Sequence, residues 1–262
     1  KWTCWGVALF PASVLYSAIT VREAWIVLCL VYGALCAVRW HRGRGWGWFA
    51  AATAVFLFGS GLNSGLLAAA AVVSLEALVY GARALPVGRA ARAALLAAGA
   101  FLIALAAANL AYRWGGENLI WLVRPAAFDH SQHAFSAGRT AYLGELHVRS
   151  VWDLFWQTPV RCVVFLFGFP WRGFRAGDSL AVLDALCYLA LAVLVVRRAG
   201  VLLRDRAARG VLGIAVAVTL LIATFTGNYG TAFRHRAKVA PLLIALAAAG
   251  SLPAGRRRIE ER

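Results

Sequence analysis

Long apolar stretches separated by short, arginine-rich segments recur along the whole sequence, and this pattern constrains the fold more than any other feature. Hydrophobic residues make up 62% of the 262 residues, and the mean hydropathy is +0.71, whereas ordinary soluble domains are about 45–50% apolar. A helix of roughly 20 apolar residues crosses the hydrocarbon core of a bilayer. The sequence therefore predicts an all-α integral membrane protein, a polytopic bundle of transmembrane helices.

We expect about eight spans, some of them short enough to need a thinned bilayer or snorkelling side chains at their ends. The expected spans are residues 2–17, 24–38, 46–59, 64–82, 93–112, 179–196, 210–226 and 239–252. Residues 159–169 are apolar but too short to cross, so we expect a re-entrant or interfacial element there. The polar residues 113–158 before it predict one long outer loop.

This pattern divides the chain into three parts: an N-terminal transmembrane bundle (1–112), an extracytoplasmic loop with the re-entrant element (113–178) and a C-terminal transmembrane bundle (179–262). The sequence contains no Met, so we expect that the true N-terminal part of the protein precedes Lys1. The five cysteines lie in or beside apolar stretches without CxxC spacing. They are interpreted as small residues of the membrane core rather than as a disulfide framework or a zinc site.

The charges predict an orientation. The net charge is +16, and the arginines lie in short segments between spans, which is typical of cytoplasmic loops and not of a nucleic-acid groove. The basic segments assigned to the cytoplasm are 39–45, 83–92, 197–209 and the C-terminus. Alternation then puts 18–23, 60–63, 113–178 and 227–238 together on the opposite face. We expect a multi-pass protein of the cell (plasma) membrane with a cytoplasmic C-terminus.

Residues 227–238 (GNYGTAFRHRAK) carry three cations and no acid on the face where the positive-inside rule makes cations scarce. Arg234 and Lys238 are one helical turn apart, with Arg236 between them. Two of the three can therefore face one ligand if a helix begins near Thr231. The ligand that this arrangement favours is an anion, and contact with lipid headgroups is the alternative.

The glycines around Asn228 permit a close approach of backbone amides, which bind anions where a helix begins. Asn228 and His235 are accordingly candidate substrate-binding residues beside the cations. Arg22 and Glu23 offer a second polar pair on the same face. Arg22 can bind phosphate oxygens in a bidentate way, and Glu23 can orient it or act as a base. Helix capping and snorkelling are the alternative interpretation of this pair.

The expected outer loop mixes aromatic and polar side chains. Its aromatic residues are Trp114, Trp121, Phe128, Phe135, Tyr142, Trp152, Phe155 and Trp156. Stacking on such rings together with carboxylates such as Asp129 suits a saccharide, but an aromatic belt at the membrane surface has the same composition. The spacing of Asp129, His130 and His133 matches no zinc signature, so no metal site is predicted.

Two carboxylates fall inside expected spans, where a lone charge is costly. Glu76 and Asp184 should each face the protein interior and have a partner, and Arg161 is one possible partner for Asp184. The sequence has no P-loop, GxSxG, HExxH or dinucleotide fingerprint. It therefore supports neither ATP hydrolysis nor soluble-type redox chemistry, and no cofactor is predicted.

The order of the motifs resembles that of polytopic membrane glycosyltransferases and oligosaccharide-repeat polymerases of surface-polysaccharide assembly. The similar parts are Phe10-Pro-Ala-Ser13 with Ser17, Arg22-Glu23, the mid-chain outer loop, residues 165–171 ending in Trp171, and residues 227–236. The resemblance implies a polyprenyl-phosphate or polyprenyl-pyrophosphate glycan as donor at the extracytoplasmic face, and no nucleotide sugar. Membrane lipid and other proteins of polysaccharide assembly would be the further partners.

The resemblance also implies roles for the candidate residues. The general base would be Glu23 or Asp129, and the residues that bind the substrate would be Arg22, Trp171, Asn228, Arg234, His235, Arg236 and Lys238. Such enzymes typically carry an acidic residue in their first outer loop, for which Glu23 is a substitute candidate. The alternatives are a lipid-glycan flippase with a polar path around Glu76 and Asp184, and a non-catalytic membrane scaffold subunit.

Overall fold

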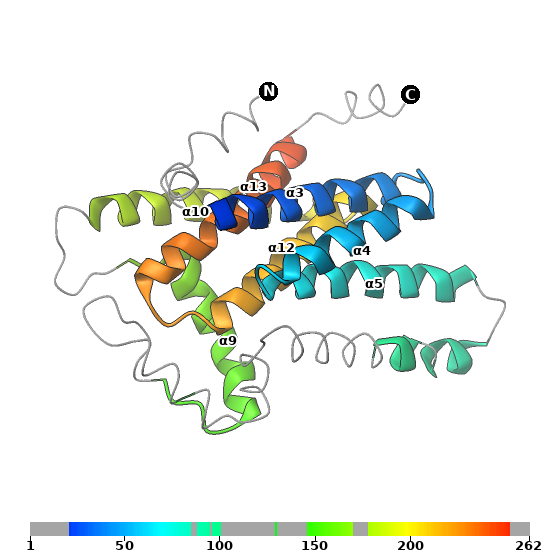
Figure 1. Ribbon diagram of the computed structural model, residues 1–262, viewed down its shortest axis with the longest axis horizontal. Helices are drawn as coiled ribbons and strands as arrows, with labels where there is room; N and C mark the ends of the chain where they lie inside the picture. The colour runs from blue at the N-terminus through cyan, green and yellow to red at the C-terminus, as the bar shows by residue number, and fades with distance from the viewer. Residues whose placement is uncertain are drawn as a thin grey trace.

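A computed structural model describes residues 21–84, 88–94, 96–100, 129, 146–169 and 178–251. Every regular element in this part of the chain is a helix, as the sequence predicted. The helices are α3 (Val21–His41), α4 (Trp46–Ser60), α5 (Gly65–Ala84), α9 (Val151–Phe167), α10 (Ser179–Arg197), α11 (Ala199–Leu202), α12 (Arg206–Thr224) and α13 (Tyr229–Ser251) (Figure 1).

Three helices of the described part are long and apolar enough to cross a membrane: α3, α10 and α12. Helix α4 and residues 65–80 of α5 are apolar but shorter. Three candidate spans are fewer than the eight that were expected, and the expected span at 2–17 and most of that at 93–112 lie outside the described residues. The prediction of apolar helices long enough to cross a membrane is thus confirmed for α3, α10 and α12.

Helices α3, α4 and α5 lie side by side, and α12 packs against α5 and α3 while α13 packs against α12 and α10 (Figure 1). The turn between α3 and α4 needs Gly43 and Gly45, whose φ angles of 78° and 94° are unfavourable for other residues. Farther along, Gly33 of α3 lies against the ring of Phe56, where a Cβ would approach within 2.4 Å. This contact lets α3 and α4 pack closely around a buried core.

One end of the bundle joins the segments that the sequence assigned to the outer face. The Nε of Arg22 donates to the carbonyl oxygen of Leu62 at 3.1 Å, and Glu23 forms an ion pair with Lys238. Arg22 and Glu23, connector 60–63 and connector 227–238 therefore meet where α3 begins.

The other end joins the segments assigned to the cytoplasm. His41 Nε2 lies 2.8 Å from Glu76 Oε2, and the guanidinium of Arg209 donates to the Tyr80 hydroxyl at 3.1 Å. Arg206 stacks on the Tyr80 ring, 3.3 Å from its centroid. Within the described residues, the ends of 39–45 and 197–209 thus lie together, away from the start of α3. Which end faces the cytoplasm stays a prediction.

Helix α9 differs from its expected form, because it begins at Val151 rather than Pro159 and contains Pro159. Ser150 and Asp153 form a capping box that starts the helix, with Ser150 N donating to Asp153 Oδ2 at 2.7 Å. Hydrogen bonds from the Arg149 backbone, the Trp156 side chain and Ser150 lower the pKa of Asp153. The expected element was bounded by its apolar residues, so the helical residues 151–158 that this cap starts were assigned to the outer loop.

Close packing of α3 on α4 predicts a specific sensitivity to volume. We expect Gly33→Ala to lower stability by about 1–3 kcal/mol, because its methyl group would collide with the Phe56 ring. Gly47→Ala is the matched control, since a Cβ there meets nothing within 4 Å in the same helix pair. Thermal unfolding of the two purified variants in one detergent measures the difference, and equal melting temperatures would contradict the packing.

Candidate anion-binding site

The candidate site lies where the start of α3 meets the first turns of α13. Lys238 Nζ is 2.9 Å from Glu23 Oε2, and Arg234 Nε is 3.6 Å from Glu23 Oε1. The Lys238 side chain is 2% exposed and that of Glu23 is 12% exposed, whereas that of Arg234 is 42% exposed. Arg234 is thus the member of this group that an external ligand can reach directly.

These contacts correct the expectation that the cations of 227–238 have no carboxylate partner. Arg234 and Lys238 do face one group, as their spacing predicted, but that group is Glu23 of the protein itself. The sequence could not reveal this pairing, because Glu23 and Lys238 are far apart along the chain. Glu23 was instead interpreted as a residue that orients Arg22 or acts as a base, with helix capping as the alternative.

Arg22 adds a third cation to the same place. Both its Nε and its Nη2 donate to the carbonyl oxygen of Leu62, and its side chain is exposed. Its charge is felt by Lys238, whose pKa it helps to lower. Two cations, Arg234 and Lys238, therefore contact the carboxylate of Glu23, and a third, Arg22, lies near Lys238. Three cations minus one carboxylate leave two positive charges without a carboxylate in this group.

His235 and Lys238 belong to residues 229–238, the polar part of α13 before its apolar stretch. Burial and the cations Lys238, Arg234 and Arg22 lower the pKa of His235 to about 3. The neutral ring can then accept a hydrogen bond from Lys238 Nζ, 2.8 Å from its Nδ1. Burial also lowers the pKa of Lys238 to about 8, although the Glu23 carboxylate opposes this shift.

Arg236 points to the opposite side of α13 from Arg234 and Lys238. Its Nε lies 2.6 Å from Asp184 Oδ2 on α10, and both side chains are almost fully buried. Its Nη1 donates at 3.1 Å to the carbonyl oxygens of Leu166 and Gly168 at the end of α9. Arg236 thus joins three helices, so its geometry is that of a structural residue.

Asn228 caps α13. Its Oδ1 accepts hydrogen bonds from the backbone of Gly230 at 2.8 Å and of Thr231 at 3.2 Å. This is the ordinary role of an asparagine before a helix, and α13 accordingly begins at Tyr229, slightly earlier than predicted. The cap satisfies the backbone amides that the sequence offered as anion ligands.

Asp129 forms a different contact. Its carboxylate lies 3.1 Å from His147 Nδ1 and accepts from the backbone of Val148 at 2.8 Å. These contacts tie residue 129 to the segment that leads into α9. Trp171, His130 and His133 lie outside the described residues, and within the described ones no group of three or more His, Cys, Asp or Glu side chains could hold a metal ion.

The two carboxylates of the expected spans both have partners, as predicted. Glu76 pairs with His41, whose side chain is fully buried, and Asp184 pairs with Arg236. Arg161, which the sequence offered as a partner for Asp184, donates to Gln157 on its own helix at 3.0 Å. Arg236 was missed as a partner because it precedes the expected span at 239–252 and was therefore interpreted as a ligand-binding residue of the outer face.

Comparisons of the chain with protein-family models, with curated proteins and with solved structures each find no match. The resemblance to membrane glycosyltransferases therefore stays a prediction from short motifs.

The different burial of the Arg236–Asp184 and Arg234–Glu23 ion pairs predicts losses of stability of different size. Asp184→Asn leaves the buried Arg236 guanidinium without its carboxylate, and we expect a loss of about 3–5 kcal/mol. Arg234→Gln removes a charge that is well exposed, so we expect a loss of only about 0–1 kcal/mol. Thermal unfolding and the amount of protein in membranes measure both, and a stable Asp184→Asn variant would refute the structural role.

Proposed function

We propose that the protein is an integral membrane enzyme of cell-surface glycan assembly, which transfers or polymerises sugars from a polyprenyl-phosphate or polyprenyl-pyrophosphate donor at the extracytoplasmic face. The observation that carries the proposal is the excess of cations in the group formed by Arg22, Arg234, Lys238 and the one carboxylate of Glu23. It combines residues from both ends of the described chain. An excess of positive charge at the end of apolar helices suits the phosphate of a lipid carrier.

Arg22 and Arg234 are the proposed phosphate ligands, because their side chains are exposed and a guanidinium binds phosphate oxygens with two parallel hydrogen bonds. Lys238 is buried behind them and fixes Glu23. His235 in turn orients Lys238. We assign Arg236 and Asn228 to the support of this site, because their polar groups are engaged within the protein.

In the proposed reaction the acceptor hydroxyl gives its proton to a carboxylate, and its oxygen forms a bond to the anomeric carbon of the donor sugar. The bond between that carbon and the carrier's phosphate oxygen breaks, and the charge that develops on the phosphate is stabilised by Arg22 and Arg234. Glu23 and Asp129 are the two candidate bases: Glu23 lies within the cationic group, where it pairs with Lys238 and Arg234, and Asp129 contacts His147.

Helix α9 fits this proposal as an interfacial element. Figure 1 shows α9 running across the direction of α3, α4 and α5. Trp152, Phe155 and Trp156 are exposed on one side of it, whereas Gln157 and Arg161 are buried on the other. Exposed tryptophans on an amphipathic helix are typical of the boundary between lipid and water.

A non-catalytic scaffold is the second candidate, and one observation favours it. Glu23 and Asp184 already neutralise part of the positive charge of α13. Ion pairs of this kind hold helices together whether or not a ligand binds. A scaffold would tolerate the loss of the exposed cations, whereas an enzyme would not.

Removing the two exposed cations tests the enzymatic proposal. We expect the double variant Arg22→Gln/Arg234→Gln to reduce glycan elongation by about tenfold or more, because each charge-assisted hydrogen bond contributes about 1.5–3 kcal/mol. The measurement is the length of surface glycan made by cells whose only copy of the chain is the variant. The amount of protein in the membrane should not change.

The matched control is Arg42→Gln/Arg44→Gln, which removes the same charge from two exposed arginines of the connector between α3 and α4. That connector lies at the opposite end of α3, so we expect normal glycan length. Full elongation in the Arg22/Arg234 variant would refute the catalytic site and favour the scaffold.

The orientation can be tested independently. In a background without the native cysteines, we expect Gly61→Cys to react with a membrane-impermeant maleimide from outside intact cells, and Arg204→Cys to react only after the cells are opened. Gly61 has a φ of −65°, which any residue tolerates, and both positions are exposed. Labelling of both from the same side would remove the basis for an extracytoplasmic site.

A further inference from the structure

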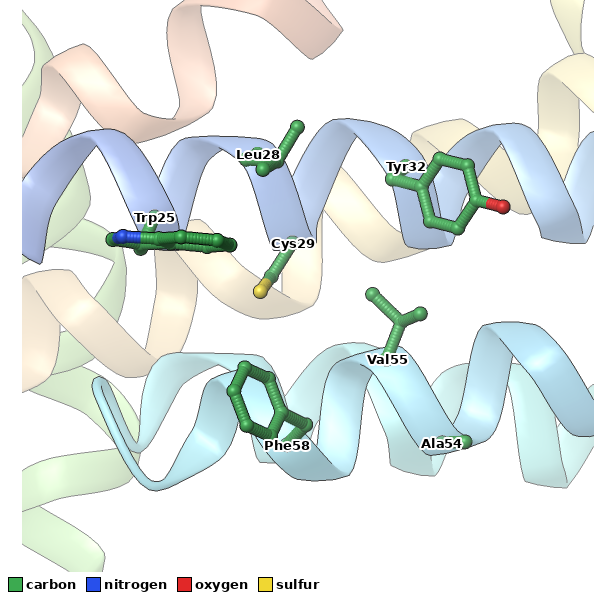
Figure 2. A pocket seen from close by; sticks show the side chains of 7 residues that line it. All are labelled: Trp25, Leu28, Cys29, Tyr32, Ala54, Val55 and Phe58. Carbon is green, nitrogen blue, oxygen red and sulfur yellow. The ribbon is translucent and has the colours of Figure 1, made fainter.

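An apolar groove of about 490 Å³ runs between α3 and α4, and it belongs to none of the ion pairs described above. Figure 2 shows the side chains that line it, with the Cys29 thiol directed into the gap between the two helices. The lining residues are Trp25, Leu28, Cys29 and Tyr32 of α3 and Ala54, Val55 and Phe58 of α4.

Close contacts between the two helices form the floor of this groove. A Cβ on Gly59 would approach the Cβ of Cys29 within 2.9 Å, so the backbones come together there. The rims are larger: Trp25 and Phe58 are both more than half exposed. The groove therefore has a floor of small residues and edges of aromatic residues.

Arg22, one member of the cationic group, lies at one end of the groove. Arg22 precedes Trp25 by three residues and therefore lies on the same side of α3. Its guanidinium reaches the carbonyl oxygen of Leu62, which lies just beyond the end of α4. The groove thus leads from a region of excess positive charge into the apolar length of a helix that is long enough to cross a membrane.

We propose that this groove binds the isoprenoid chain of a polyprenyl phosphate whose phosphate group lies against Arg22 and Arg234. The inference rests on the proposed function and adds to it the place where the carrier lipid is held. Two observations support it: the lining is apolar throughout its length, and the charge at its end is complementary to phosphate.

The residues that line the groove come from two adjacent helices only, so one chain can lie along it. A polyprenyl phosphate has one chain that ends directly in its phosphate. The chain in the groove would therefore bring the phosphate to Arg22 without a glycerol backbone between them.

Photo-crosslinking tests this assignment without any need for turnover. The full chain, in phosphatidylcholine nanodiscs, is irradiated with a polyprenyl phosphate that carries a diazirine on its isoprenoid chain. We expect labelled peptides from α3 and α4 around Cys29 and Val55. Predominant labelling of α10, an apolar helix outside the groove, would overturn the proposal even if every variant failed to fold.

Two variants and a control test whether the groove and Arg22 determine the affinity for the probe. We expect Ala54→Trp, which fills the groove, and Arg22→Gln, which removes a phosphate ligand, each to raise the half-saturating probe concentration by about tenfold or more. Ala190→Trp changes an alanine of α10 that is also exposed, and it should leave the half-saturating probe concentration unchanged. Equal labelling of the Ala54→Trp and Ala190→Trp variants would overturn the proposal.

Competition identifies the occupant. Unlabelled polyprenyl phosphate should displace the probe, whereas the polyprenyl alcohol, phosphatidylglycerol and inorganic phosphate should not do so at the same concentration. Displacement by phosphatidylglycerol would assign the groove to ordinary anionic lipid, and displacement by the alcohol would remove the role of Arg22.

Groove labelling in a protein whose Arg22/Arg234 variant still elongates glycans would refute the enzymatic function alone. Loss of elongation without groove labelling would refute this inference alone.

Discussion

Two buried ion pairs on opposite sides of α13 determine how the described helices come together. Lys238 reaches Glu23 of α3 on one side, and Arg236 reaches Asp184 of α10 and the last carbonyl groups of α9 on the other. Charges removed from water are costly unless they are paired with good geometry. Residues 229–238 of α13 can therefore lie inside the bundle only while α3, α9 and α10 supply these partners.

The same pairing controls what charge remains at the surface. Because Glu23 accepts both Lys238 and Arg234 while Arg22 lies nearby, the carboxylate is shared and the group keeps a positive excess. The buried lysine and the neutral His235 hold the group in place, and the exposed arginines are left to contact a ligand. The apolar groove between α3 and α4 begins near Arg22, three residues before Trp25, so charge and apolar surface are adjacent there.

Sequence patterns predicted some elements closely and misplaced others for identifiable reasons. The bounds of α4 and α10 agree with the apolar stretches at 46–59 and 179–196, because no polar residue interrupts those stretches near their ends. The start of α13 was placed too late, since hydropathy excludes Arg236 and Lys238 although their buried partners keep them in the helix. The start of α9 was missed because the expected element included only the apolar residues 159–169, whereas the helix begins at Val151 with a cap formed by Ser150 and Asp153.

Composition alone determined the helical class and the need of Glu76 and Asp184 for partners, because each follows from the cost of polar groups in an apolar environment. Only the tertiary structure decided which partners meet. The pairs Glu23 with Lys238 and Asp184 with Arg236 join residues that are distant in sequence, and no local pattern encodes such a distance. For that reason the cations were visible in the sequence, but the carboxylates that share them and the groove beside them were not.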